Sequence, residues 1–153
     1  MIIKADWKNP IKLEDGGKNN QIYAVNTEKI SENGGCYVFY NKHGNSYSVL
    51  YIGKAENLQR RIEQQFNNLK LMMGIKKSIK GTKFIMCCDV PGKNKAKKFK
   101  RTIKMLEKQL IKSATLEGHE LLNQKGIKIK YNQILFKGNR ESEEIFGRKM
   151  NIS

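Results

Sequence analysis

Residues 35–61 read GCYVFYNKHGNSYSVLYIGKAENLQRR, and this stretch decides the fold. The run 36–40 is rich in aromatic and β-branched residues, which favour strands. A second run of the same type covers 47–52, and the turn between the two contains Gly44. Two such runs joined by a glycine-containing turn predict a β-hairpin, which we expect to end at Gly53.

Hydrophobic periodicity predicts the elements that follow the hairpin. Apolar residues at helical spacing indicate one helix over 56–71. A third strand is expected over 83–90, where β-forming residues precede the breaker pair Pro91-Gly92. The longest helix is expected over 96–114, again from apolar residues at 3.6-residue spacing. Together these elements predict a domain of the α+β class.

The two ends of the chain carry weaker patterns than its middle. Residues 1–34 look irregular, apart from a short strand expected over 21–25. Residues 127–136 alternate in part like a strand, and one helical turn is expected over 141–146.

The net charge of the chain limits the kinds of molecule that we expect it to bind. Thirty Lys and Arg against 14 Asp and Glu give a formal net charge of +16. Such an excess attracts polyanions, whether nucleic acid or an anionic membrane face, and a merely solubilising surface is the other interpretation. We expect no membrane span, because no apolar run approaches the required ~20 residues. The lack of a signal-peptide pattern and the odd number of cysteines predict a cytoplasmic protein.

Two charged residues stand at the borders of apolar helix faces. Glu107 lies about 40° around the axis from Ile103, at the edge of the face that the longest helix buries. Arg61 borders the apolar face of the preceding helix, whereas Arg60 points away. A carboxylate beside core residues needs a cation as partner. An Arg61–Glu107 ion pair that joins the helices and a functional site are both open interpretations.

The order of these motifs resembles the GIY-YIG nuclease family. GCY at 35–37 matches the first tripeptide of that name, with Cys36 in place of Ile, and YIG at 51–53 matches the second. The longer stretch YIGKAENLQRRI is similar to the nuclease domain of the bacterial excision-repair endonucleases. Side chains alternate along a strand, so Cys36 is expected to face away from Tyr37. The replacement of the family's Ile by Cys36 is therefore a mild departure from the motif.

The resemblance implies a DNA endonuclease that hydrolyses phosphodiester bonds with a divalent metal ion, Mg²⁺ or Mn²⁺. It implies that Glu107 binds the ion and that Arg61 binds phosphate oxygens. Tyr37 would take a proton from the attacking water, and Tyr51 would orient water or phosphate. Lys54 would contact the phosphate or favour the Tyr37 phenolate.

Three further positions match the family, and one departs from it. Gly35 and Gly53 are expected to support the site, and Asn123 either orients a ligand or caps a helix. Many members carry His four residues after the arginine, where this chain has Gln65. Because Gln cannot act as a base, proton transfer is assigned to Tyr37.

Basic runs are the expected contacts to the backbone of double-stranded DNA. Such contacts give affinity without sequence information, and a plain solvated surface is the other interpretation. The residues assigned to this role are Lys76, Lys77, Lys80, Lys93, Lys95, Lys97 and Lys98.

We interpret residues 1–153 as a single domain built on a three-stranded antiparallel sheet flanked by helices, with a nuclease core over 34–126. The extensions 1–33 and 127–153 are available for DNA recognition or dimerisation, and a homodimer is one way to cut both strands. A stand-alone, restriction-like enzyme is favoured. A nicking enzyme of the repair type and a catalytically silent binding module of the same fold stay open.

Overall fold

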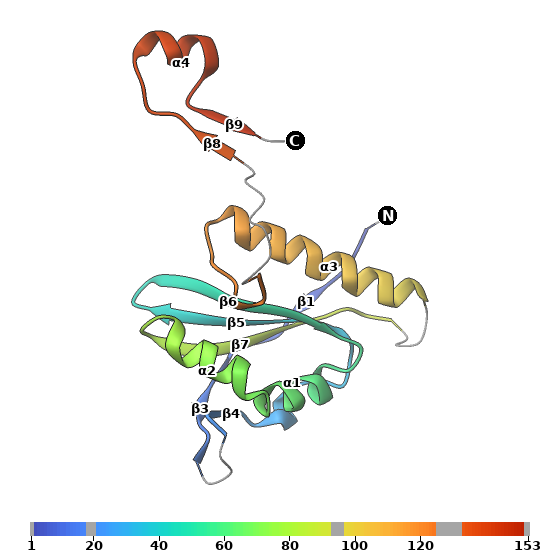
Figure 1. Cartoon of the computed structure of the whole chain (residues 1–153). Coiled ribbons are helices and arrows are strands. Elements are labelled where there is room, and N and C mark those ends of the chain that lie inside the picture. Colours follow the sequence, from blue (N-terminus) through green and yellow to red (C-terminus); the bar gives the residue numbers. More distant parts are fainter. Residues whose placement is uncertain (1, 18–20, 93–96, 125–132, 152–153) are drawn as a thin grey trace.

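The computed structural model describes residues 2–17, 21–92, 97–124 and 133–151. An antiparallel sheet of five strands forms its centre, with helices on both faces (Figure 1). The strands follow the order β1-β7-β5-β6, and β2 also pairs with β7. Their bounds are β1 Asp6–Trp7, β2 Ile11–Lys12, β5 Gly35–His43, β6 Ser46–Ala55 and β7 Thr82–Asp89.

The hairpin predicted from the sequence is confirmed as β5 and β6. The two strands pair along their whole length, with one irregularity of register between Phe39 and Tyr40. The expectation that Gly53 ends the second strand is wrong, because Gly53 lies inside β6 and pairs with Tyr37. The Tyr37 ring occupies the space that a side chain at Gly53 would need.

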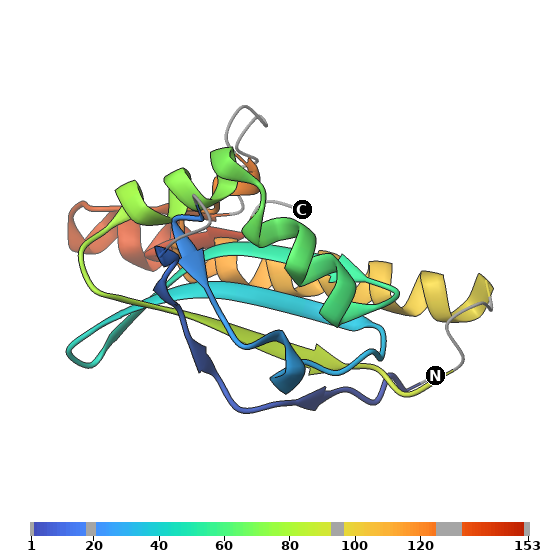
Figure 2. The ribbon, with the colours of Figure 1, turned by 90° about the horizontal axis from the view of Figure 1, so that it is seen from below.

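One predicted helix is divided into two. The structure has α1 (Leu58–Phe66) and α2 (Leu69–Ser78) where the sequence predicts one helix over 56–71. The side chain of Asn68 accepts a hydrogen bond from the backbone N–H of Leu71 at 3.1 Å, which starts a new helix. Figure 2 shows α1 and α2 together on one face of the sheet. On the other face lies α3 (Lys97–Leu116), close to its expected range.

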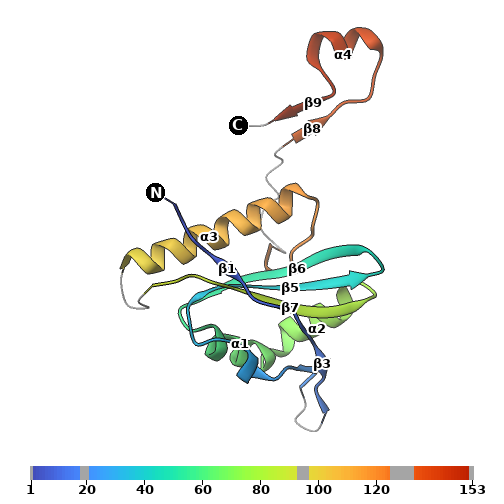
Figure 3. The same ribbon diagram turned by 180° about the vertical axis from the view of Figure 1, so that it is seen from behind.

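The N-terminal segment belongs to the sheet and to the core, although the sequence indicates irregular structure there. Its strands β1 and β2 extend the sheet beyond β7, which Figure 3 shows from behind. Leu13 and Ile30 are buried in the same apolar cluster as Tyr37. The remaining elements of this segment are β3 (Glu14–Asp15), β4 (Tyr23–Ala24) and a 3-10 turn at Thr27–Lys29.

The C-terminal segment forms a small unit of its own. β8 (Gln133–Leu135) pairs with β9 (Lys149–Asn151), and α4 (Arg140–Phe146) lies between them in sequence. A 3-10 turn at Leu122–Gln124 comes before the unit. None of the helices in the described ranges combines the length and apolar character that crossing a membrane needs.

The faces of the sheet separate the side chains of β5. Tyr37 and Phe39 lie in the cluster on the α1 and α2 face. Cys36 faces α3 instead, and its thiol donates to the carbonyl of Ile103 at 3.6 Å. Val38 packs with Ala114 of α3 on that same side. Cys36 therefore faces away from Tyr37, as the alternation along the strand predicts.

A buried lysine joins the end of α2 to the sheet. The ammonium of Lys83 donates to Asn41 Oδ1 at 2.7 Å and to the carbonyl of Ile79, just after α2 ends. We expect Lys83→Met to lower the free energy of unfolding by about 1–3 kcal/mol, because one buried and one partly buried acceptor lose their donor. The matched change Lys12→Met, at an exposed position of β2, should stay within ~0.5 kcal/mol. Urea unfolding measures both, and equal losses would contradict this account of Lys83.

Candidate active site

Two tyrosines from neighbouring strands lie side by side on the α1 face. Tyr37 of β5 is 1% exposed, and its ring stacks on that of Tyr51 of β6 with centroids 6.2 Å apart. A Cβ added to Gly53 would lie 2.3 Å from Cζ and 2.4 Å from the hydroxyl oxygen of Tyr37. Glycine at this position thus lets the Tyr37 hydroxyl reach across β6, the outermost strand on this side of the sheet.

Gln65 of α1 joins the two hydroxyls. Its side chain is buried, and Nε2 donates to the hydroxyl oxygen of Tyr37 at 2.7 Å and to that of Tyr51 at 3.3 Å. Its Oε1 accepts from Asn68 Nδ2 at 3.3 Å. The residue that departs from the family pattern is therefore the one that connects both predicted catalytic tyrosines.

Arg61 is exposed and lies one helical turn before Gln65. Burial raises the pKa of Tyr37 to about 12, while hydrogen bonding from Gln65 and the hydrogen bond and charge of Arg61 act to lower it. Nη1 of Arg61 also donates to Gln64 Oε1 at 3.4 Å. The structure thus brings Tyr37, Tyr51 and Arg61 together, as expected from the sequence.

Glu107 and Lys54 lie on the opposite face of the sheet. Lys54 pairs with Cys36, the residue that faces α3, whereas Gly53 pairs with Tyr37. Burial raises the pKa of the half-buried Glu107, and the charge of Lys54 lowers it. In the described ranges, the ion pairs do not include one between Arg61 and Glu107, so the interpretation that such a pair joins the helices is wrong.

Asn123 binds the backbone of the same edge strand. Its Nδ2 donates to the carbonyl of Ile52 at 2.9 Å, next to Gly53. Within the described residues its Oδ1 is buried and has no hydrogen-bond partner. Nearby, Nδ1 of His119 accepts from the N–H of Val49 at 3.1 Å, so two side chains after α3 cover the open edge of β6.

The predicted residues therefore form two sets around one edge. Tyr37, Tyr51 and Arg61 lie on one face of β6, Lys54 lies on the other with Glu107, and Asn123 binds the edge itself. The described residues contain no group of three His, Cys, Asp or Glu side chains that could hold a metal ion. A lone carboxylate does not suit zinc, but it suits Mg²⁺, which keeps several waters and takes further oxygens from phosphate.

The remaining predicted positions have different surroundings. A Cβ at Gly35 would lie 1.9 Å from the carbonyl oxygen of Cys88, so this glycine permits close approach of β5 to β7. Of the predicted DNA contacts, one group is at the end of α2 and the other at the start of α3, on opposite faces of the sheet. Lys76, Lys77 and Lys80 form the first group and Lys97 and Lys98 the second, while Lys93 and Lys95 lie outside the described residues.

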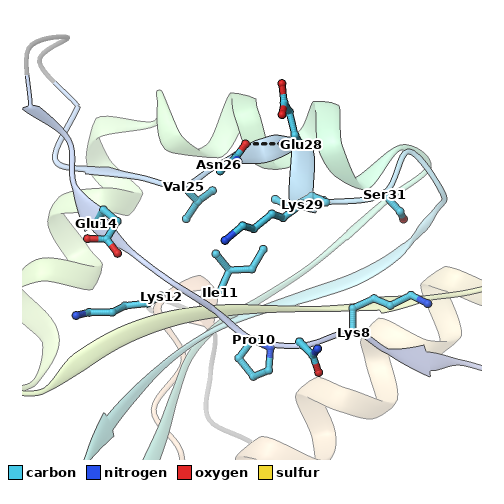
Figure 4. A pocket seen from close by; sticks show the side chains of 12 residues that line it. Lys8, Pro10, Ile11, Lys12, Glu14, Val25, Asn26, Glu28, Lys29 and Ser31 are labelled. Carbon is cyan, nitrogen blue, oxygen red and sulfur yellow. Dashed lines mark hydrogen bonds between the residues drawn. The ribbon is translucent and has the colours of Figure 1, made fainter.

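A groove of ≈ 890 Å³ lies apart from these residues, in the N-terminal segment. Lys29, Ile11 and Val25 face one another across it (Figure 4). Its lining mixes lysines with Glu14 and Glu28, and it includes no predicted catalytic residue. The groove is thus separate from the edge at Gly53.

Comparison with known proteins gives one family match. The model of the GIY-YIG catalytic domain matches residues 33–116. The chain is also 42% identical over 43 residues to the UvrABC system protein C of Methanococcus maripaludis, which is 28% of this chain and 8% of that relative. No solved structure matches the chain. The matched range contains the tyrosines, Arg61 and Glu107, and it ends before Asn123.

Proposed function

Because this chain belongs to the GIY-YIG family, we propose that it is a divalent-metal-dependent DNA endonuclease of a stand-alone, restriction-like type. The observation that carries the proposal is the hydrogen-bonded group of Tyr37, Gln65 and Tyr51, with Arg61 beside it at the edge of β6. The amide of Gln65, which donates to the Tyr37 hydroxyl, and the charge of Arg61 both favour the ionised phenol, although burial opposes them and raises the pKa of Tyr37.

Each residue has a distinct task in phosphodiester hydrolysis. Arg61 binds two phosphate oxygens with its planar guanidinium and places the phosphorus near the tyrosines. Tyr37 accepts the proton of the attacking water, and Tyr51 orients that water. Because burial keeps Tyr37 protonated in the free protein, with its pKa raised, its deprotonation must accompany the arrival of positive charge at the site.

Glu107 is the residue that would hold the metal ion. Its half-buried carboxylate, together with an Asn123 oxygen that has no hydrogen-bond partner among the described residues, fits an ion that keeps most of its waters, such as Mg²⁺ or Mn²⁺. When bound there, such an ion would supply charge stabilisation for the phosphate and its leaving oxygen. Lys54 favours the ionised Glu107 carboxylate by lowering its pKa.

The exposed face of α3 supports DNA as substrate. Five cations recur there at intervals of three or four residues, which places them in one column along the helix. The column lies opposite the buried residues Phe99 and Ile103, and it borders Glu107. A duplex bound to the column would present phosphates to the edge of β6. Its members are Lys97, Arg101, Lys104, Lys108 and Lys112.

The test is cleavage of supercoiled plasmid by the purified chain, with Mg²⁺, Mn²⁺ or EDTA. We expect metal-dependent cutting, a loss of about 10²-fold or more in Arg61→Ala, and near-parent activity in Arg60→Ala, the exposed neighbour on the same helix. Discrete linear fragments support a restriction-like enzyme and a cut by two copies. Open circles alone support the repair-type nicking enzyme. Binding without cutting under every metal would favour the silent binding module instead.

A further inference from the structure

Helix α1 carries a buried polar side chain that the family resemblance leaves without a task. Gln65 is 3% exposed and stands seven residues after Leu58, on the apolar side of the helix. Its amide nitrogen has two protons, and the structure has two acceptors within reach, the hydroxyl oxygens of Tyr37 and Tyr51. The number of donors thus equals the number of acceptors.

The orientation of this amide is fixed from the next helix. Asn68 caps α2, and only its Oδ1 can accept the N–H of Leu71 at 3.1 Å. Its Nδ2 must then face Gln65, whose Oε1 accepts at 3.3 Å. With Oε1 engaged in this way, Gln65 presents Nε2 to the tyrosines. The backbone N–H of Leu71 therefore fixes the orientation of Asn68, and Asn68 fixes that of Gln65. Gln65 in turn donates to the oxygens of both phenols.

We propose that Gln65, oriented by Asn68, is a positioning residue that makes both tyrosine oxygens acceptors and turns both phenol protons away from α1. This proposal rests on the proposed function, because it concerns the same hydrolysis. The phenol proton of Tyr37 is left free to point toward the edge of β6, where glycine leaves room. The amide also stabilises the phenolate that forms when Tyr37 loses that proton.

The sharpest test changes Asn68, which touches neither tyrosine hydroxyl. Asp caps a helix as well as Asn does, so Asn68→Asp keeps α2, but its carboxylate cannot donate to Gln65. The Gln65 amide then turns to donate to Asp, and its oxygen faces the tyrosines. We expect kcat to fall about 10- to 100-fold with KM and the thermal midpoint nearly unchanged.

A matched control and a double variant separate this role from a structural one. Asn67→Asp makes the same change of charge at the neighbouring residue, whose side chain bonds Gln21 at 2.7 Å and the carbonyl of Glu63 at 3.3 Å instead of Gln65, and should leave kcat unchanged. Gln65→Met removes the amide and should lower kcat by a similar factor. Adding Asn68→Asp to Gln65→Met should then have no further effect, because Asn68 acts only through Gln65.

The contrary results are equally definite. Parent-like kcat in folded Asn68→Asp, or a double variant whose loss is the product of the two single losses, would overturn the proposal. Nuclear magnetic resonance of the metal-free protein gives a readout without activity, since the side-chain amide protons of Gln65 should be slow to exchange and should change in Asn68→Asp. If these protons exchange slowly and change in Asn68→Asp while the parent cuts no DNA, the proposed function fails but the orientation of Gln65 by Asn68 is supported.

Discussion

Glu107→Gln is expected to abolish metal-dependent cleavage, by about 10³-fold or more, while leaving the fold as stable as before or more so. The loss follows because a neutral amide no longer holds a divalent cation, and several kcal/mol of charge stabilisation disappear with it. The stability is retained because burial raises the pKa of Glu107, which means that the folded protein disfavours the charge that Gln removes. Plasmid cleavage and thermal unfolding measure the two effects.

Glu117→Gln is the matched control for this variant. Glu117 is exposed just after α3 and undergoes the same change of charge, so activity and stability should both stay near those of the parent. Calorimetric titration should show that Glu107→Gln binds Mn²⁺ more weakly than the parent does, and that Glu117→Gln binds it as the parent does. Cleavage by Glu107→Gln within tenfold of the parent would remove Glu107 from the metal site.

Gly53→Ala is expected to damage both stability and activity. The added methyl group would overlap the Tyr37 ring, so either β6 or the ring must move, at about 1–3 kcal/mol for overpacking. A shift of about 1 Å at a catalytic group lowers the rate by roughly 10²-fold. Gly74→Ala is the control, because its Cβ would meet only the tip of Leu122 at 3.3 Å and alanine favours the helix.

A double-mutant cycle connects the loss to Tyr37 itself. With Tyr37→Ala the ring is gone, so Gly53→Ala should then cost much less than in the parent. We expect a coupling free energy of about 0.5–3 kcal/mol from urea unfolding of the four proteins. Additive costs would show that the Tyr37 ring does not require glycine at position 53.

Strong local sequence patterns predict the central strands and the longest helix. They do not predict the two-residue strands or the capped break between α1 and α2. The hairpin and β7 follow from long β-forming runs, and α3 from its apolar periodicity. The break at Asn67-Asn68 is hidden because the apolar spacing continues across it, although two adjacent asparagines are a capping signal. β1 and β2 have two residues each, too few for any periodicity, and only their pairing with β7 makes them strands.

The site shows a similar division. Motif order indicates Tyr37, Tyr51 and Arg61, and the structure places them together. The order of the motifs cannot indicate that β6 separates these three residues from Glu107, because the face on which a residue lies depends on pairing across strands. From the motif alone, Gln65 is known only as the residue that stands where many family members have histidine. Its spacing of seven residues from Leu58 is the available signal, since a polar residue on an apolar helix face needs a partner.

The outer strands of the sheet have a consequence for how the chain is made. Asp6 pairs with Asp89, which comes 83 positions later in the chain. At the usual speed of translation, the ribosome needs roughly 4–17 s to add that length. β1 therefore leaves the ribosome well before its partner and stays unpaired in the meantime, because β7 must be made before β1 can pair with it. A nascent chain stalled before residue 82 should accordingly expose residues 2–17 to protease.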